Sequence, residues 1–228
     1  MLMKRLHILS RRLHLDNRLQ EFEKGHEAFQ KIKFNQSKDR FKKLVEEGQN
    51  PKALFIGCSD SRVMPAMITG SKPGDLFIVR NIGNFVAPYN PSANYHATAS
   101  AIEYAVSILE VSDIIVCGHS HCGAIAALYK DIQQTPENIH TIKWLELGSE
   151  AKKVATLAHK NSDKDIMLRY TEQISVVYQI DNLLTYPAVK RRVEEGTLFI
   201  HGWHYDIENG SIEYYDDENY EFKALTQK

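Results

Sequence analysis

The chain has 228 residues, of which 43% are hydrophobic and 25% are charged, with 28 basic residues against 29 acidic ones. This composition predicts one globular domain with a sizeable core and excludes a fibrous or disordered protein. The balanced charge gives no global attraction to nucleic acid or an anionic membrane, so we expect no nucleic-acid partner. No apolar run approaches the roughly 20 residues that span a bilayer, so we expect no membrane span.

The first 19 residues are basic, and cationic side chains interrupt every apolar stretch in them. A secretory signal needs roughly 7–15 apolar residues in a row, so this segment does not fit one. Two interpretations stay open: an amphipathic targeting or membrane-surface helix, and an exposed helix that packs on a partner subunit. The chain has three cysteines, an odd number. Without an export signal, they favour reduced thiols and a cytoplasmic location over a disulfide framework.

Apolar residues recur at three- and four-residue steps from about residue 16 to residue 47, which predicts a helical segment that Gly48 and Pro51 bring to an end. Three short, continuous apolar runs predict strands that are buried on both faces; they cover residues 53–57, 75–79 and 113–117. Helical patterns follow the second and third of these runs, at residues 95–110, 121–129, 142–159, 165–184 and 187–195.

Two further strands are predicted at residues 197–204 and 211–215, and the turn signal Asn209-Gly210 between them predicts antiparallel pairing. Strands that alternate with helices predict an α/β fold with a mainly parallel central sheet, one antiparallel edge strand and flanking helices. No linker or repeat divides the chain. We therefore expect a single domain made of an N-terminal helical arm (1–50), an α/β core (51–215) and a tail (216–228).

Chemically active side chains follow two of the predicted strands at the point where each strand ends. Cys58 comes directly after the run 53–57, and His119 closely follows the run 113–117. Cys122 lies three residues after His119, where the next helix begins, and a helix N-terminus favours a thiolate. Carboxyl ends of parallel strands meet at one edge of a sheet. Two thiolates and one imidazole at that edge predict a Zn²⁺ site.

The number of ligands indicates what such a site does. Structural zinc sites have four protein ligands, whereas catalytic sites keep one position open. The third cysteine, Cys117, lies within a strand and is expected to point away, which leaves the fourth position for water or for Asp60. An Asp60 carboxylate held by Arg62 would orient a zinc-bound hydroxide for attack on an electrophile. If Arg62 moves away, Asp60 becomes the fourth ligand; a purely structural ion pair is the remaining alternative.

Segments 58–62 and 117–124 together resemble the β-class carbonic anhydrases, and so do residues 73–81, 101–106 and 202–205. The resemblance covers about residues 29–215. It implies reversible hydration of CO₂ to bicarbonate and a proton, with one Zn²⁺ per chain held by Cys58, His119 and Cys122. It also implies that Asp60 and Arg62 form the catalytic pair.

Gln49, nine residues before the first cysteine ligand, resembles the plant-type branch of this family and implies a glutamine that hydrogen-bonds a substrate oxygen. The same resemblance implies further substrate contacts from Gly123 and an apolar CO₂ pocket lined by Phe77, Ile82 and Tyr104, with Tyr104 supplied by the same subunit or by a dimer partner. The bicarbonate-regulated branch carries Trp three residues before the first cysteine. Here that residue is Phe55, which predicts a water-ligated zinc rather than a site closed by Asp60.

The resemblance implies a homodimer or homotetramer in which N-terminal helices wrap a neighbour. A carbonyl sulfide or carbon disulfide hydrolase would share all three zinc ligands and stays an alternative. So does a zinc-binding regulatory protein without enzyme activity, although such a protein needs neither Gln49 nor an Asp60–Arg62 pair. His121 and His204 titrate near neutrality, either as proton relays or as surface or helix-start residues. Neither Gly-rich phosphate-binding motif occurs, which excludes a nucleotide-binding module of those types.

Overall fold

The computed structural model describes residues 19–92 and 96–225. Residues 1–18, on which both interpretations of the basic N-terminal segment depend, lie outside the described residues. The chain divides into two compact units, Met1–Gly48 and Gln49–Lys228. In the described ranges, none of the helices is both long enough and apolar enough to pass through a membrane.

The described part of the first unit is helical, as predicted for residues 16–47. It consists of α2 (Gln20–Ala28), the π-helical turn η2 (Phe29–Phe34) and α3 (Lys38–Glu47). None of these residues is buried, and the side chains of Phe22, Ile32 and Val45 are 57–84% exposed. Helices in proteins are stabilised mainly by packing of their apolar face. Within residues 19–48, the apolar side chains of this unit therefore lack the full cover that would stabilise it.

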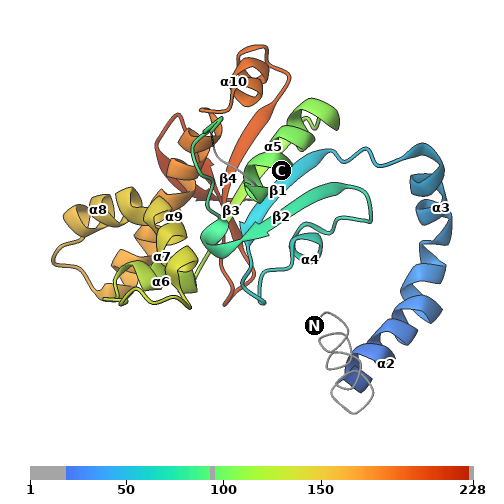
Figure 1. Cartoon of the computed structure of the whole chain (residues 1–228), viewed down its shortest axis with the longest axis horizontal. Coiled ribbons are helices and arrows are strands. Elements are labelled where there is room, and N and C mark those ends of the chain that lie inside the picture. Colours follow the sequence, from blue (N-terminus) through green and yellow to red (C-terminus); the bar gives the residue numbers. More distant parts are fainter. Residues whose placement is uncertain (1–18, 93–95, 226–228) are drawn as a thin grey trace, which may run out of the picture. The chain divides into compact units, whose positions relative to one another are not determined.

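The second unit contains a six-stranded sheet with the order β2-β1-β3-β4-β5-β6 (Figure 1). The strands are β1 (Ala53–Cys58), β2 (Leu76–Asn81), β3 (Asp113–His119), β4 (Phe199–Tyr205), β5 (Ile212–Asp216) and β6 (Glu221–Ala224). Strands β1, β2, β3 and β4 run parallel to one another, and β5 is antiparallel to both β4 and β6. The predicted mainly parallel sheet with one antiparallel strand is confirmed. The sheet has one strand more than predicted, because four residues of the expected tail form β6, which pairs with the outer side of β5.

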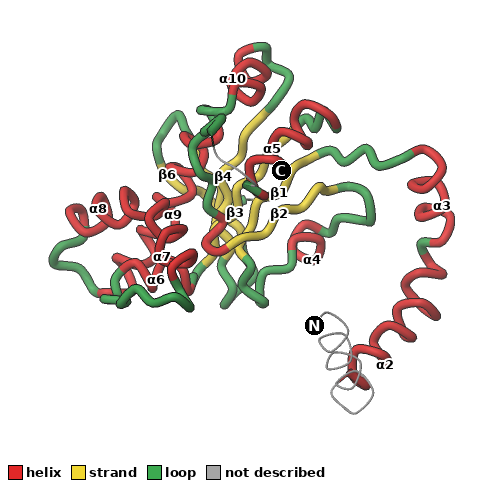
Figure 2. The backbone as a smooth tube through the Cα atoms, viewed as in Figure 1, coloured by secondary structure: helices red, strands yellow, loops and turns green. Residues whose placement is uncertain are grey.

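The helices of the second unit are α4 (Pro65–Thr69), α5 (Ala97–Glu103) with the π-helical turn η4 (Tyr104–Ile108), α6 (Gly123–Leu128), α7 (Ile139–Leu145), α8 (Ser149–Ala158), α9 (Lys164–Leu183) and α10 (Pro187–Glu194) (Figure 2). The pattern at residues 142–159 belongs to two helices, α7 and α8, which a 3₁₀ turn at Glu146–Gly148 joins. A Cβ atom at Gly148 would meet Leu128 and Phe85 at 2.8 and 2.9 Å, so close packing accounts for the glycine in this turn.

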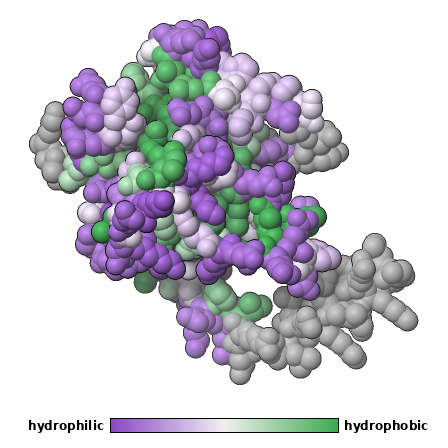
Figure 3. Space-filling view, turned by 90° about the vertical axis from the view of Figure 1, so that its left-hand side faces the viewer, coloured by the Kyte–Doolittle hydropathy of each residue, from purple (hydrophilic) through white to green (hydrophobic). Residues whose placement is uncertain are grey.

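The two faces of the sheet pack against different helices. Leu54 and Ile56 of β1 share one core cluster with Ile102 of α5, Val176 of α9 and Val189 of α10. On the alternate positions, Ala53 and Phe55 of β1 share another cluster with Ile115 and Cys117 of β3 and contact Ile68 of α4. On the face shown in Figure 3, hydrophilic residues cover much of the surface and apolar residues lie in separate patches. Helices on both faces leave the carboxyl ends of β1 and β3 as adjacent positions for a site.

Candidate metal centre and active site

The three predicted metal ligands lie together at the carboxyl edge of the sheet. Cys58 is the last residue of β1, His119 is the last residue of β3, and Cys122 directly precedes α6. All three are buried, and their ligand atoms lie within 4.8 Å of one another. In the ranges that the structure describes, this is the one group of three or more His, Cys, Asp or Glu side chains that could hold a metal ion.

His119 is fully buried and presents one ring nitrogen without a hydrogen-bond partner. Its Nδ1 atom lies 2.9 Å from the carbonyl oxygen of Ser120, so Nδ1 carries the proton and Nε2 keeps its lone pair. An unpaired nitrogen in this position costs free energy, because it has lost its hydrogen bond to water. A metal ion bound to Nε2 would remove that deficit.

The two thiols interact directly. A hydrogen bond from Cys122 lowers the pKa of Cys58 to about 4 against the opposing effect of burial, and the Asp60 backbone N–H also donates to the Cys58 sulfur, at 3.4 Å. The pKa of Cys122 is raised well above its ordinary value, first by this hydrogen bond to Cys58 and then by burial. The pair therefore holds one proton that a cation would displace. Two sulfurs and one imidazole nitrogen form a soft donor set that fits Zn²⁺.

Asp60 and Arg62 form an ion pair with two contact points. The Nε and Nη2 atoms of Arg62 donate to Oδ1 and Oδ2 of Asp60 at 2.9 and 2.7 Å, and the Arg62 backbone N–H donates to Oδ1 at 3.0 Å. Arg62 also donates to the carbonyl oxygen of His121 at 3.0 Å. Hydrogen bonds from Arg62 hold the pKa of Asp60 well below its usual range. Both carboxylate oxygens thus face the guanidinium, and Asp60 is not a member of the metal-donor group.

Arg80 is a structural contributor that we did not predict. Its Nε atom donates to the carbonyl oxygen of Cys58 at 3.0 Å, and its Nη2 atom donates to that of Asp60 at 2.7 Å. It lies on β2 opposite Gly57 of β1, within reach of the segment that follows β1. Arg80 is part of the resembling segment 73–81, but only the register of the two strands shows its contact with the ligand segment.

The residues predicted to bind substrate differ in their exposure and in the contacts they make. The rings of Phe77 and Tyr104 stack at 5.8 Å. Ile82 is 45% exposed, and its carbonyl oxygen accepts a hydrogen bond from Trp144 Nε1 at 2.8 Å. Gly123 begins α6 beside Cys122, and Gln49 is exposed before β1. Their contact with substrate stays a prediction.

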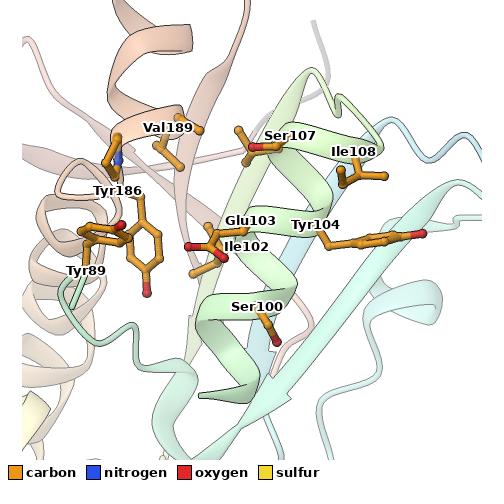
Figure 4. Close-up of a pocket in the computed structure, with 12 residues that line it drawn as sticks. Tyr89, Ser100, Ile102, Glu103, Tyr104, Ser107, Ile108, Tyr186 and Val189 are labelled. Carbon is orange, nitrogen blue, oxygen red and sulfur yellow. The ribbon is translucent and has the colours of Figure 1, made fainter. Parts of the chain in front are cut away.

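A pocket of about 470 Å³ lies between α5–η4 and α10 (Figure 4). Tyr89, Glu103, Tyr104 and Tyr186 are among the residues that line it, and none of the three metal donors does. In Figure 4 Tyr104 points away from Tyr89 and Tyr186. The pocket is therefore distinct from the metal centre.

The two candidate proton relays differ in exposure. His121 is exposed, and its Nε2 atom lies 3.2 Å from the carboxylate of Glu208. His204 is fully buried, so its interpretation as a surface residue is wrong. Burial lowers the pKa of His204, while Glu172 beside it acts in the opposite direction. His204 therefore lies in the interior of the second unit, next to Glu172.

Comparisons with known proteins agree with this geometry. A family model described as carbonic anhydrase matches residues 53–212. A carbonic anhydrase of Pseudomonas aeruginosa is 40% identical over 89% of this chain and 90% of its own length. The solved β-carbonic anhydrase CcaA has 37% identity and a TM-score of 0.84 over 91% of this chain and 100% of its own. A chain from the structures of two tetrameric β-carbonic anhydrases of Sordaria macrospora has 30% identity and a TM-score of 0.75 over 93% of this chain and 98% of its own. The chain therefore belongs to the β-carbonic anhydrases, a family of enzymes.

Proposed function

We propose that this chain catalyses the reversible hydration of CO₂ to bicarbonate and a proton, and that Cys58, His119 and Cys122 hold one Zn²⁺ for this reaction. The observation that carries the proposal is the convergence of three buried donors, one of them a histidine nitrogen without a protein partner. The similarity to carbonic anhydrases over most of the chain supports the substrate.

Zinc bound by these residues would supply Lewis acidity, which lowers the pKa of water and so makes a nucleophile available. The role of Asp60 in this proposal would be to orient a reacting water by accepting its hydrogen bond. Among the described contacts, Oδ1 of Asp60 already accepts two hydrogen bonds from Arg62, whereas Oδ2 accepts one. A carboxylate oxygen has two lone pairs, so Oδ2 is the atom that stays available. Because the pKa of Asp60 is held low, this oxygen remains an acceptor at neutral pH.

We propose a substrate pocket of the plant type. CO₂ has no net charge or dipole, so Phe77, Ile82 and Tyr104 would form its apolar wall, with Tyr104 supplied by the same subunit or by a dimer partner. Gln49 and Gly123 would contact the more polar oxygen atoms of bicarbonate. The stacked rings of Phe77 and Tyr104 support a shared role for those two residues.

We also propose that residues 1–50 act as an arm in a homodimer or homotetramer. The exposed apolar side chains of α2, η2 and α3 support this, as does the tetrameric state named for the Sordaria macrospora enzymes. Light scattering should show a dimer or tetramer. The double variant F22D/I32D should weaken the association of subunits, whereas E23Q should not. A monodisperse wild-type monomer would contradict the proposal.

Three free thiols favour a cytoplasmic location.

The direct test of activity is stopped-flow CO₂ hydration by the purified, zinc-loaded chain at about pH 8.5, where a thiolate-rich site is expected to be active. We expect fast turnover that a chelator removes and added zinc restores. Turnover that persists after complete removal of zinc would contradict the assigned centre. A zinc-loaded chain without CO₂ hydration would contradict the proposed reaction, and carbonyl sulfide would then be the next substrate to test.

A further inference from the structure

We infer that Glu172 is a positioning residue: its buried carboxylate fixes the peptide group that carries the metal ligand Cys122, and His204 keeps that carboxylate in place. The inference rests on the proposed function, because it assigns Glu172 a role toward the zinc ligands. Neither the resemblance nor the motif spacing singled out this residue, which lies 50 positions after Cys122 in the chain.

Glu172 lies on α9 and is 5% exposed. Its Oε1 atom accepts a hydrogen bond from the backbone N–H of Cys122 at 2.9 Å. Carboxylates are rarely this buried unless they are paired, and a hydrogen bond to a charged acceptor is stronger than one between neutral groups. The carboxylate therefore holds the backbone of Cys122 directly.

The second carboxylate oxygen of Glu172 faces His204, whose Nε2 atom lies 3.4 Å from Oε2. Arg169 lies next to the same imidazole, with 3.5 Å between its Nη1 atom and Nε2 of His204, and its Nη2 atom donates to Glu213 at 3.3 Å. Gln173 donates to the same carboxylate oxygen of Glu213 at 2.9 Å. With Oε2 engaged by this group, Glu172 presents Oε1 to Cys122.

The peptide unit between His121 and Cys122 is held at both of its polar ends. Its carbonyl oxygen, on His121, accepts from Nη2 of Arg62 at 3.0 Å, and its N–H group, on Cys122, donates to Glu172. His121 has a φ of +56°, a left-handed conformation that a residue with a Cβ atom adopts only where its surroundings enforce it. Two opposed hydrogen bonds on one peptide plane fix its rotation and thereby the direction of the Cys122 side chain.

Helix α9 is also packed closely on the strand that carries His119. A Cβ atom at Gly118 would meet Cγ2 of Val176 at 2.7 Å and the carbonyl oxygen of Glu172 at 3.4 Å. The position of α9 relative to β3 is therefore tightly constrained one residue before His119. Glu172 transfers this constraint to Cys122, so that one helix sets the spacing of two ligands.

Gln179 provides a matched control for a role in folding alone. It lies on the same helix and is fully buried, and its Oε1 atom accepts a hydrogen bond from the backbone N–H of Val86 at 2.8 Å. Replacing either residue by methionine removes one buried acceptor from one backbone N–H. Only the Glu172 substitution removes it next to a metal ligand.

The test compares the full-length chain and the variants E172M, E172Q and Q179M. Zinc affinity is measured by competition with a chelator, the ligand field by the absorption spectrum of the Co²⁺-substituted protein, and folding by thermal unfolding. We expect E172M to bind zinc about 10–100-fold more weakly and to show an altered Co²⁺ spectrum. E172Q, whose amide oxygen can still accept from Cys122, should stay within about threefold of the wild type. Q179M should lower the unfolding temperature and leave metal affinity and spectrum unchanged.

Equal zinc affinity and identical Co²⁺ spectra for E172M and Q179M would overturn the inference, because Glu172 would then contribute only to folding. An E172Q variant as weak as E172M would also overturn it, since the acceptor position would not be what matters. A wild-type chain that binds neither metal would instead contradict the proposed function.

Discussion

Two buried histidines on neighbouring strands have similar positions and different surroundings. His119 ends β3 and His204 lies on β4, where the parallel register pairs His204 with Gly118. Both side chains are fully buried, and each has one ring nitrogen without a hydrogen-bond partner, Nε2 in His119 and Nδ1 in His204. Two cysteine sulfurs surround His119, whereas Glu172, Glu213 and Arg169 surround His204. An unpaired buried nitrogen thus indicates a metal ligand only where other donors converge on it.

The same difference shifts the pKa values of the two rings in opposite directions. Burial lowers the pKa of both histidines. For His119 the negative charge of the nearby Cys58 sulfur acts against burial, and the net pKa is raised. For His204 burial, reinforced by the charge of Arg169, outweighs the effect of Glu172, and the net pKa is lowered. The anionic sulfur region therefore attracts a cation, whereas the His204 region neutralises its charges internally.

The strongest test of this comparison removes one sulfur that belongs to the metal-donor group and, separately, one that does not. Cys122→Ser should reduce zinc from about one ion per chain to near zero and abolish CO₂ hydration, because the serine hydroxyl is a poor zinc ligand. Cys117 is buried in the opposite cluster, and burial raises its pKa to about 12. Cys117→Ala should keep its zinc. Metal content by atomic absorption decides the matter, and stoichiometric zinc in the Cys122 variant would refute the ligand assignment.

A second test separates holding the metal from using it. Asp60→Ala should retain zinc, and its hydration rate should fall about 10²–10⁴-fold, which is the usual contribution of a positioned acid–base group. Glu150→Ala breaks an exposed ion pair with Lys153 and should change neither quantity. Stopped-flow rates and metal content are measured on the same samples. A hydration rate for Asp60→Ala equal to that of the wild type would show that the Asp60–Arg62 pair is structural.

The sequence was sufficient to predict the parallel part of the sheet. The apolar runs in β1 and β3 are typical of strands buried on both faces, and nearly all residues of these two strands are buried. The same expectation for residues 75–79 was wrong in its burial, because β2 is an edge strand of the sheet and none of its residues is buried. Strand β6 was missed because it has four residues, none of them fully buried. Helix α4 was missed for a similar reason: five residues are too few to show a helical period, although Pro65 and Gly70 mark its ends.

The predicted metal donors could be found because each follows a recognisable strand end. Glu172 and Arg80 could not be found in this way. Their contacts depend on how α9 packs on β3 and on the register of β2 with β1, which are long-range properties of the fold. The burial of His204 likewise depends on a long-range contact, with Glu172 of α9.

A third test disturbs the packing of α9 on β3, which connects the surroundings of His119 and His204. Gly118→Ala should destabilise the chain by about 1–3 kcal/mol, because its Cβ atom would lie 2.7 Å from Val176 Cγ2 in a packed interior. Gly123→Ala meets no atom within 4 Å and should leave stability unchanged or raise it by up to about 1 kcal/mol. Urea unfolding of both variants measures the difference. Equal stabilities would mean that α9 and β3 are not as tightly packed as the comparison requires.

The smallest expected effect concerns pH and distinguishes the two histidines that were candidate relays. Because the pKa of His204 is lowered in the folded chain, the unfolded chain binds more protons below about pH 6.5, the ordinary histidine value. Stability therefore falls as pH drops below that value. His204→Gln should lose less stability between pH 7.5 and pH 5.5 than the wild type, whereas His121→Gln, which alters an exposed side chain, should lose as much. Urea unfolding of zinc-saturated samples at both pH values measures these differences. A His204→Gln variant with the same pH dependence as the wild type would show that His204 is not the buried neutral group on which the contrast with His119 depends.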